Sequence, residues 1–302
     1  MLWENLLSGF KNFLRIDKGL SANTIEAYLH DVCLLQNHLE SQGILSPLKV
    51  GVEDIPHFLQ TLSEKYNITE TSQARCLSGI RAFYKYLLYE DLIPYSPFEL
   101  IESPKLARKL PQILSFEEIE RIENAFDLSK QENFRNKAII ETLYSCGLRV
   151  SELVNLKKSN LHFKQEFIMI VGKGNKQRIV PIGSYARKLI TMYMDDIRVH
   201  LPIQKGHEDY VFLNRRGRKL TRVYVFTMIK QVVSDAGINK EVSPHTFRHS
   251  FATHLLEGGA DLRSIQMMLG HESITTTEIY THINSEYLTD TILSFHPRYK
   301  VG

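Results

Sequence analysis

One stretch of the chain departs from helical periodicity and thereby limits the folds open to it. In "QEFIMIVGKGNKQRIVPIG", residues 165–183, two runs rich in β-branched residues flank Gly172-Lys173-Gly174-Asn175. This pattern predicts an antiparallel hairpin with Lys173 at its tip. A second short extended segment is predicted at 209–220, before a helix capped by Thr221. Because the rest of the sequence has helical spacing, we predict a mainly α-helical fold with a small antiparallel β-sheet.

The first hundred residues carry apolar side chains at helical spacing and predict a domain of about four helices. Ser21 is expected to cap a helix over 21–40. A second helix, over 71–90, has an apolar stripe that leaves three basic side chains outside it: Arg75, Arg81 and Lys85. These three are predicted to be free to contact phosphate groups, although a solvated helix face would explain them at least as well.

The chain is about twice the length of a typical domain, so two domains are expected. Proline and lysine cluster in "ESPKLARKLPQIL", residues 102–114, where Pro104 and Pro111 prevent a continuous helix. We therefore predict a helical domain over 1–103, a linker over 104–112 and a second domain over 113–302. In the second domain, Ser115 and Glu118 form a predicted capping box, and a long buried helix is expected to end at Gly147.

The composition limits the classes of protein to which the chain can belong, but it does not identify a binding partner. No apolar run approaches the roughly 20 residues that a membrane span needs, and the chain start lacks the features of a signal peptide, so a cytoplasmic protein is expected. The three cysteines, Cys33, Cys76 and Cys146, are scattered and predict reduced thiols. Residues 1–111 carry 11 basic and 13 acidic side chains, and the remainder carries 26 and 21, so a polyanion would bind mainly the second part.

Residues 243–282 contain five histidines, and a metal site is one interpretation of them. His245 and His249 have the i, i+4 spacing that zinc sites use, and His254 follows five residues later. However, Thr275 stands where a second histidine would complete an H-E-x-x-H motif begun at His271, and no carboxylate accompanies the first two histidines. A metal site is therefore the weaker interpretation.

A site for a phosphodiester explains the same residues better. Arg149 and Arg248 each lie in an apolar context where an unpaired charge is costly. Planar guanidinium groups match the oxygens of a phosphoryl group in transfer. Either arginine alone could form a structural salt bridge, but together with Lys173 and the histidines they indicate a phosphoryl-transfer site.

The ordered set of these residues resembles the active site of the tyrosine recombinases, also called phage-integrase-type recombinases. The set consists of Arg149, Lys173, His245, Arg248, His271 and Tyr280. The segments "GLSANTIEAYLHDV", "LSGIRAFYKYLL" and "HTFRHSFATHLLEGGADLRSIQMMLGH" are similar to the Xer branch of that family, over nearly the whole chain. The resemblance implies a SAM-like helical core-binding domain followed by a catalytic domain.

The resemblance also implies a role for each residue of the set. Tyr280 would attack the scissile phosphate and form a 3′-phosphotyrosyl link, releasing a 5′-hydroxyl. The 5′-hydroxyl of a neighbouring strand would then reverse the step. Arg149, Arg248 and His271 would donate to the non-bridging oxygens, Lys173 would protonate the leaving oxygen, and His245 would accept a proton. Glu152 could orient Arg149, although an acidic residue near a helix start is common for electrostatic reasons. Neither a metal nor a cofactor would be required.

A basic stretch and a terminal helix indicate the partners. "NRRGRKLTR", residues 214–222, is expected to contact phosphates through Arg215, Arg216, Arg218, Lys219 and Arg222, although it could be only a solvated turn. The resemblance implies binding to a double-stranded DNA recombination site, with the helical domain on one face of the duplex and the catalytic domain on the other. It also implies a tetrameric synapse with itself or a second related recombinase, coupled by the segment after Tyr280, and a possible DNA translocase as activator. No membrane partner is expected.

The resemblance to the Xer branch implies a recombinase that resolves chromosome dimers at cell division, and three alternatives stay open. A mobile-element integrase would use the same chemistry, and genomic neighbourhood would distinguish it. A DNA-binding protein that has lost catalysis is disfavoured by the complete set of active-site residues. A type IB topoisomerase uses similar chemistry but would relax DNA without a partner.

Overall fold

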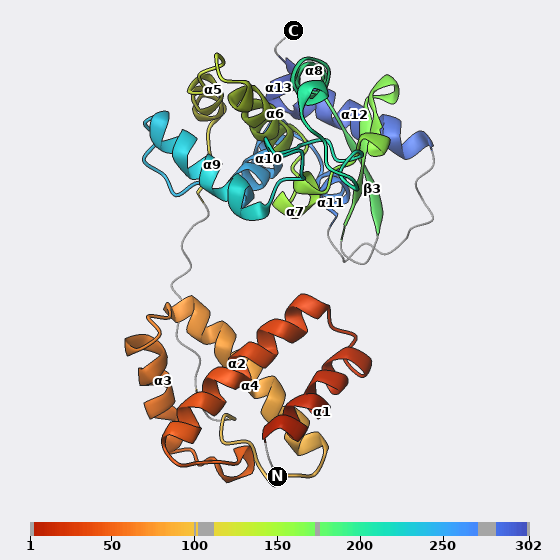
Figure 1. Cartoon of the computed structure of the whole chain (residues 1–302). Coiled ribbons are helices and arrows are strands. Elements are labelled where there is room, and N and C mark those ends of the chain that lie inside the picture. Colours follow the sequence, from red (N-terminus) through yellow and green to blue (C-terminus); the bar gives the residue numbers. More distant parts are fainter. Residues whose placement is uncertain (1–2, 100, 102–111, 173–175, 271–281, 301–302) are drawn as a thin grey trace. The chain divides into compact units, whose positions relative to one another are not determined.

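The computed structural model describes residues 3–99, 101, 112–172, 176–270 and 282–300. The chain divides into two compact units, Met1–Lys109 and Leu110–Gly302, called here the N-terminal and the C-terminal unit. In Figure 1 the described part of the N-terminal unit consists of helices and loops, whereas the C-terminal unit combines helices with a small sheet. The predicted mainly helical fold with a small antiparallel sheet is confirmed. Across the described ranges, none of the helices has the length and hydropathy that crossing a membrane requires.

Four α-helices make up most of the described N-terminal unit. They are α1 (Trp3–Ile16), α2 (Ala22–Ser41), α3 (Asp54–Glu64) and α4 (Glu70–Tyr89), with a 3₁₀ turn at Pro47–Lys49. The Ser21 hydroxyl accepts a hydrogen bond from the backbone N–H of Thr24, which confirms the predicted cap of α2. Stacked and edge-on aromatic rings of α1 and α4, among them Phe10 and Phe83, fill the core.

The C-terminal unit contains most of the helices and the sheet. Its described α-helices are α5 (Phe116–Asn124), α6 (Gln131–Ser145), α7 (Val150–Val154), α8 (Ser184–Met192), α9 (Arg222–Asp235), α10 (Pro244–Gly258), α11 (Leu262–Leu269), α12 (His282–Phe295) and α13 (Pro297–Lys300). Short 3₁₀ turns lie at Lys158–Asn160, Phe163–Gln165 and Arg198–His200, and a π-helical turn at Tyr193–Ile197. The capping box of Ser115 and Glu118 and the cap by Thr221 are both present.

The sheet contains β1 (Leu161–His162), β2 (Phe167–Val171) and β3 (Gln177–Pro181), in that order and antiparallel. Ile170 pairs with Arg178 across β2 and β3, and the N–H of Gly172 donates to the carbonyl of Lys176 at 2.8 Å. Residues 173–175, the predicted tip with Lys173, lie outside the described ranges. The predicted short extended segment at 209–220 forms two isolated antiparallel bridges, Lys157 with Tyr210 and Leu213 with Lys219, and adds no strand to the described sheet. The buried Arg198 donates to the carbonyls of Tyr210 and Val211 in this segment and to that of Glu208 just before it.

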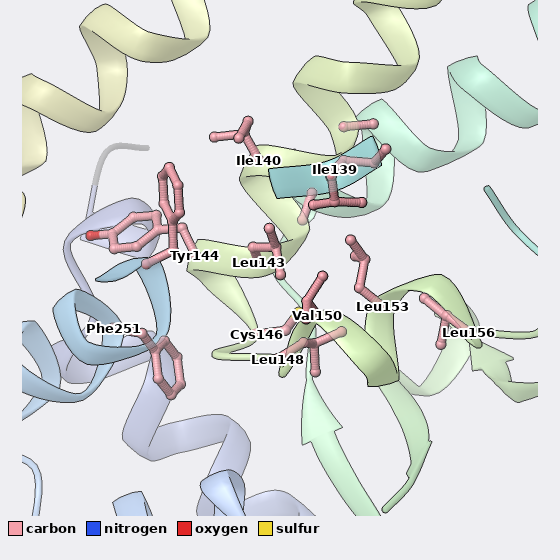
Figure 2. Close-up of a cluster of buried hydrophobic side chains, with 14 of the residues drawn as sticks. Ile139, Ile140, Leu143, Tyr144, Cys146, Leu148, Val150, Leu153, Leu156 and Phe251 are labelled. Carbon is pink, nitrogen blue, oxygen red and sulfur yellow. The ribbon is translucent and has the colours of Figure 1, made fainter. Parts of the chain in front are cut away.

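The core of the C-terminal unit surrounds α6 and the turn that follows it. Figure 2 shows Ile139, Ile140, Leu143 and Tyr144 on α6, followed by Cys146, Leu148, Val150, Leu153 and Leu156, with Phe251 contributed by α10. Gly147 ends this helix with a left-handed φ of +58°. A Cβ at Gly147 would lie 2.5 Å from Cδ1 of Phe251, so both the backbone angle and the packing require glycine here. The turn at Gly147 delivers the chain directly to Arg149.

We expect Gly147→Ala to lower the free energy of unfolding by about 2–5 kcal/mol, since the left-handed angle and the overlap with Phe251 both add cost. Gly237→Ala is the matched control, because Gly237 has a φ of +65° and a Cβ there would meet nothing within 4 Å. The control should lose only about 1–2 kcal/mol. Urea denaturation followed by circular dichroism measures both, and equal losses would contradict the packing argument.

A buried ionic cluster anchors the end of the chain to α5 and α6. The Arg298 side chain, from α13, is 10% exposed and meets Glu141 at 2.9 Å, Glu123 at 3.0 Å and Glu120 at 3.6 Å. Burial, together with the charge of Glu123, raises the pKa of Glu141 well above its usual range. In the same region His296 is buried between Tyr144 and Phe251, and burial lowers its pKa to about 3. Arg298 is thus the cation that compensates the buried carboxylates.

We expect Arg298→Met to destabilise the C-terminal unit by about 3–5 kcal/mol at neutral pH, because it leaves Glu123 and Glu141 buried beside each other without a cation. A carboxyl with a raised folded-state pKa contributes stability below its unfolded pKa and loses it as the pH rises. The deficit relative to wild type should therefore shrink as the pH falls from about 8 toward about 5. Melting curves across this range measure it, with the exposed Arg263→Met as control, and a deficit that grows toward acid pH would contradict the explanation.

Candidate active site

Arg149 stands at the start of α7, immediately after the Gly147 turn. Its backbone N–H donates to Oε2 of Glu152 at 2.8 Å, and its Nη1 donates to Oε1 of the same carboxylate at 3.0 Å. The Arg149 side chain is 37% exposed, whereas that of Glu152 is 4% exposed. The guanidinium is therefore held from its buried side and keeps part of its surface open to a ligand.

Arg248 approaches the same place from α10. It is buried, and it donates from Nη1 to the carbonyl of Gly147 at 2.8 Å and from Nη2 to the carbonyl of Leu269 at 2.6 Å. Arg149 also donates to the Leu269 carbonyl, at 3.3 Å, and to that of Gly270 at 3.4 Å. The two arginines, about a hundred residues apart in sequence, thus converge on one carbonyl oxygen at the end of α11.

The electrostatics of the pair favour an added anion. Burial, followed by the charge of Arg149, lowers the pKa of Arg248 to about 9. A shift in this direction means that the surroundings disfavour the cation as long as no anion is bound. Perturbed groups of this kind concentrate at functional sites. A phosphate placed between the two guanidinium groups would relieve the unfavourable charge.

Arg178, on β3, belongs to the same cluster and was not predicted from the sequence. It is buried, and its Nη1 and Nη2 donate to the two oxygens of Glu152, each at 2.8 Å, while its Nε donates to the carbonyl of Met268 at 2.7 Å. Burial opposes ionisation of Glu152, but the hydrogen bonds and charge of Arg178 and the hydrogen bonds of Arg149 outweigh it and lower the pKa of Glu152. The only signal in the sequence is that Arg178 shares an alternating strand face with Val180, a face that is normally apolar.

The remaining predicted catalytic residues divide into one that is described and three that are not. His245 is exposed and lies in the first turn of α10, one turn before Arg248. Lys173, His271 and Tyr280 lie outside the described residues. Their roles stay predictions.

The histidines considered for a metal site are in different environments. His245 and His249 are exposed on α10. His254 is half-buried, and its Nδ1 forms a hydrogen bond of 2.8 Å with the hydroxyl of Tyr144. Burial lowers the pKa of His254. In the ranges that the structure describes, no three side chains of the metal-binding types are grouped as an ion would require.

The predicted DNA contacts of the N-terminal unit lie on α4. Arg75 donates to both oxygens of the buried Asp31, at 2.7 and 2.8 Å, although half of its own side chain is exposed. Arg81 donates to the carbonyls of Phe98 and Ile101. Lys85 is exposed. These bonds give Arg75 and Arg81 an intramolecular task, and phosphate contact by all three residues stays a prediction.

The predicted basic loop of the C-terminal unit is held by the side chain of Asn214 and by close packing of Gly217. The side chain of Asn214 accepts from the N–H groups of Arg216 and Arg218, and Gly217, with a φ of +72°, packs so closely that a Cβ would lie 2.0 Å from the Pro202 carbonyl. Four arginines of this stretch are exposed: Arg215, Arg216, Arg218 and Arg222. Lys219 is half-buried, donating to Asn155 at 2.8 Å and lying over the ring of Tyr210. The loop presents a basic surface next to the start of α9.

Comparisons with known proteins agree with this arrangement. Residues 112–286 match the phage integrase family, and residues 7–91 match the N-terminal SAM-like domain of phage integrases. The chain is 41% identical over 296 residues to tyrosine recombinase XerD of Listeria innocua serovar 6a, covering 98% of this chain and 99% of that protein. It is 42% identical over 300 residues to tyrosine recombinase XerD of Chlorobaculum tepidum, covering 98% and 97%.

The fold is also that of a solved recombinase. The crystal structure of the XerH site-specific recombinase bound to a palindromic difH substrate, a post-cleavage complex, has a TM-score of 0.69 at 23% identity. The match covers 95% of this chain and 84% of that one. Taken with the match to the family over most of the C-terminal unit, these relationships assign the chain: it belongs to the phage integrase family and is a tyrosine recombinase of the Xer branch, an enzyme of site-specific DNA recombination.

Proposed function

We propose that the chain cuts and rejoins DNA at a specific site through a covalent link between Tyr280 and a 3′-phosphate. The observation that carries this proposal is the convergence of Arg149 and Arg248 on the carbonyl of Leu269. Two guanidinium groups held in a partly buried site provide the planar donors that the non-bridging oxygens of a phosphodiester require. The lowered pKa of Arg248 supports the same site, because it indicates cationic charge that an anion would stabilise.

The proposed cleavage step is a phosphoryl transfer without net change in the number of ester bonds. The Oη of Tyr280 forms a bond to phosphorus, and the bond from phosphorus to the 5′-oxygen breaks. His245 accepts the tyrosine proton, and Lys173 supplies a proton to the leaving 5′-oxygen. Arg149, Arg248 and His271 donate to the non-bridging oxygens, where charge grows in the transition state. Attack by the 5′-hydroxyl of another strand reverses these changes and completes strand exchange.

The biological role that we propose is resolution of chromosome dimers at cell division, in the cytoplasm. The support is the identity of about two residues in five to the XerD relatives over nearly their whole length. A mobile-element integrase with the same chemistry is the alternative, and an attachment site or transfer genes beside the gene would favour it.

For DNA, we propose contacts from both units. The exposed arginines of the loop 214–222 and the basic side chains of α4 would meet backbone phosphates, so affinity should fall steeply with salt. The recombination site would be held by four protomers, either identical or shared with a second related recombinase, and a DNA translocase would act as activator. In this assembly, α12 and α13 would dock onto a neighbouring protomer and make there the contacts that they make within their own chain in this structure.

A selection with nicked DNA tests the proposed function. The protein is incubated with a genomic library of duplexes that carry a nick, without divalent cations, and protein-linked fragments are recovered after denaturation. A nick lets the short 5′-terminated piece diffuse away, which traps the covalent intermediate. We expect fragments that share one short sequence. Recovery no higher than with heat-denatured protein would contradict the proposal.

A further inference from the structure

Arg178 is a buried cation for which neither the sequence motif nor the proposed mechanism provides a task. Its side chain is 5% exposed and makes hydrogen bonds to Glu152 through Nη1 and Nη2 and to the Met268 carbonyl through Nε. Burying a guanidinium is costly unless its donors are satisfied. The presence of a buried arginine therefore has to be explained by the segments that its hydrogen bonds hold in place.

The contacts of Arg178 join the three segments that lead to the proposed catalytic groups. Arg178 itself is on β3, Glu152 is on α7 next to Arg149, and Met268 is in the last turn of α11. The backbone at Gly270 and at Gly172 also lies close to the Arg178 side chain. A Cβ on Gly270 would be 3.0 Å from Cδ of Arg178, and one on Gly172 would be 3.8 Å from its Nη1. Arg178 therefore lies beside Gly270, the residue before His271, and near Gly172, the residue before Lys173.

The sharing of Glu152 has an electrostatic consequence for Arg149. Arg178 uses both oxygens of this carboxylate, at 2.8 Å each, whereas the guanidinium of Arg149 reaches only Oε1, at 3.0 Å. A carboxylate between two guanidinium groups neutralises each of them only in part. Without Arg178, Glu152 would be free to form a closed ion pair with Arg149 and draw its charge away from a phosphate.

We infer that Arg178 is a positioning residue for strand cleavage. It braces the hairpin and the end of α11 around Arg149, and it competes for Glu152 so that Arg149 keeps its charge available for the scissile phosphate. The inference rests on the proposed function, since it assigns Arg178 a task in the same phosphoryl transfer. Arg178 itself does not touch the DNA.

The first test compares Arg178→Lys and Arg178→Met with Arg198→Lys and Arg198→Met. Arg198 is an equally buried arginine that donates to the carbonyls of Glu208, Tyr210 and Val211. Melting temperature, the Kd for a nicked recombination site and the single-turnover rate of covalent adduct formation at saturating protein are measured, at a temperature where all variants are folded. Both pairs should melt earlier than wild type.

We expect the Arg178 variants to form the adduct about 100-fold more slowly, because misplacement of a catalytic group by about an ångström has effects of this size. Their Kd should stay within about threefold of wild type, because the contacts to most DNA phosphates are elsewhere. The Arg198 variants should keep the cleavage rate within about threefold, because Arg198 contacts none of the proposed catalytic groups that the structure describes. Equal cleavage rates in the two pairs would overturn the inference while leaving the proposed function intact.

The second test separates competition for Glu152 from simple bracing. In Arg178→Met, the freed carboxylate pairs with Arg149, so adding Glu152→Gln should remove this anion and raise the cleavage rate about tenfold, in line with coupling between contacting residues. The glutamine keeps an oxygen that can accept from the backbone N–H of Arg149. A double variant no faster than Arg178→Met would overturn the competition. Failure of the wild-type chain to form any adduct would overturn the proposed function and this inference together.

Discussion

Tyr280→Phe is expected to abolish covalent attachment to DNA while leaving DNA binding unchanged. The substitution removes only the hydroxyl that forms the bond to phosphorus, and a phenyl ring offers no other nucleophile. Loss of the nucleophile in an enzyme that works through a covalent intermediate lowers the rate by at least about 10⁴-fold. The adduct is measured on a denaturing gel with a nicked recombination site, and binding is measured by mobility shift at the same salt concentration.

Tyr287→Phe is the matched control for Tyr280→Phe. Tyr287 lies on α12, half exposed, and its hydroxyl donates to Asp261 at 2.9 Å. Removing this hydroxyl should lower stability slightly, by about 1 kcal/mol, and leave the cleavage rate within about threefold. Adduct formation by Tyr280→Phe at the wild-type rate would show that another residue is the nucleophile.

Arg248→Lys is expected to slow cleavage by about 10²–10³-fold, the effect of losing one preorganised donor to a developing oxyanion. Lysine carries the charge but lacks the planar guanidinium group that donates to the carbonyls of both Gly147 and Leu269. It therefore cannot bind these carbonyls and donate to the phosphate at the same time. The single-turnover rate of adduct formation measures the loss. Binding to DNA should weaken far less, since most of the affinity arises from other phosphates.

Arg198→Lys again serves as the control for Arg248→Lys, because it too removes a buried guanidinium bound to carbonyl oxygens. A cleavage rate of Arg248→Lys close to that of Arg198→Lys would mean that Arg248 has a structural task only. A loss confined to DNA affinity would also contradict the assigned role, because a group that acts in the transition state affects the rate at saturation.

Most of the fold could be predicted because periodicity and caps are local. The apolar stripe of α4, the capping box at Ser115 and the end of α6 before Gly147 all follow from residues within a few positions of each other. The segment 209–220 was harder, since its carbonyls at Tyr210 and Val211 accept hydrogen bonds from Arg198, a side chain outside the segment. Periodicity within a segment carries no information about such a partner.

The site was predictable in part. Which of its residues could be predicted depends on whether the neighbouring sequence makes the residue conspicuous. Arg149 and Arg248 stand out as charges in apolar surroundings, and the structure brings them to one carbonyl oxygen. In the sequence, Arg178 follows the predicted basic tip of a hairpin, so one more arginine there is not conspicuous. Its importance comes from Glu152 and Met268, which lie 26 and 90 positions away in the sequence. Only the folded chain brings these together.

The measurement that tests the central claim most directly is identification of the residue joined to DNA. A nicked recombination site labelled on the 3′-phosphate side is incubated with the full-length chain in excess EDTA, the adduct is digested with trypsin and nuclease, and the labelled peptide is sequenced by mass spectrometry. We predict a peptide that carries a nucleotide on Tyr280, linked through a 3′-phosphate. A nucleotide on a different residue, a link to the 5′-phosphate, or formation of the adduct only when a divalent cation is restored would contradict the account.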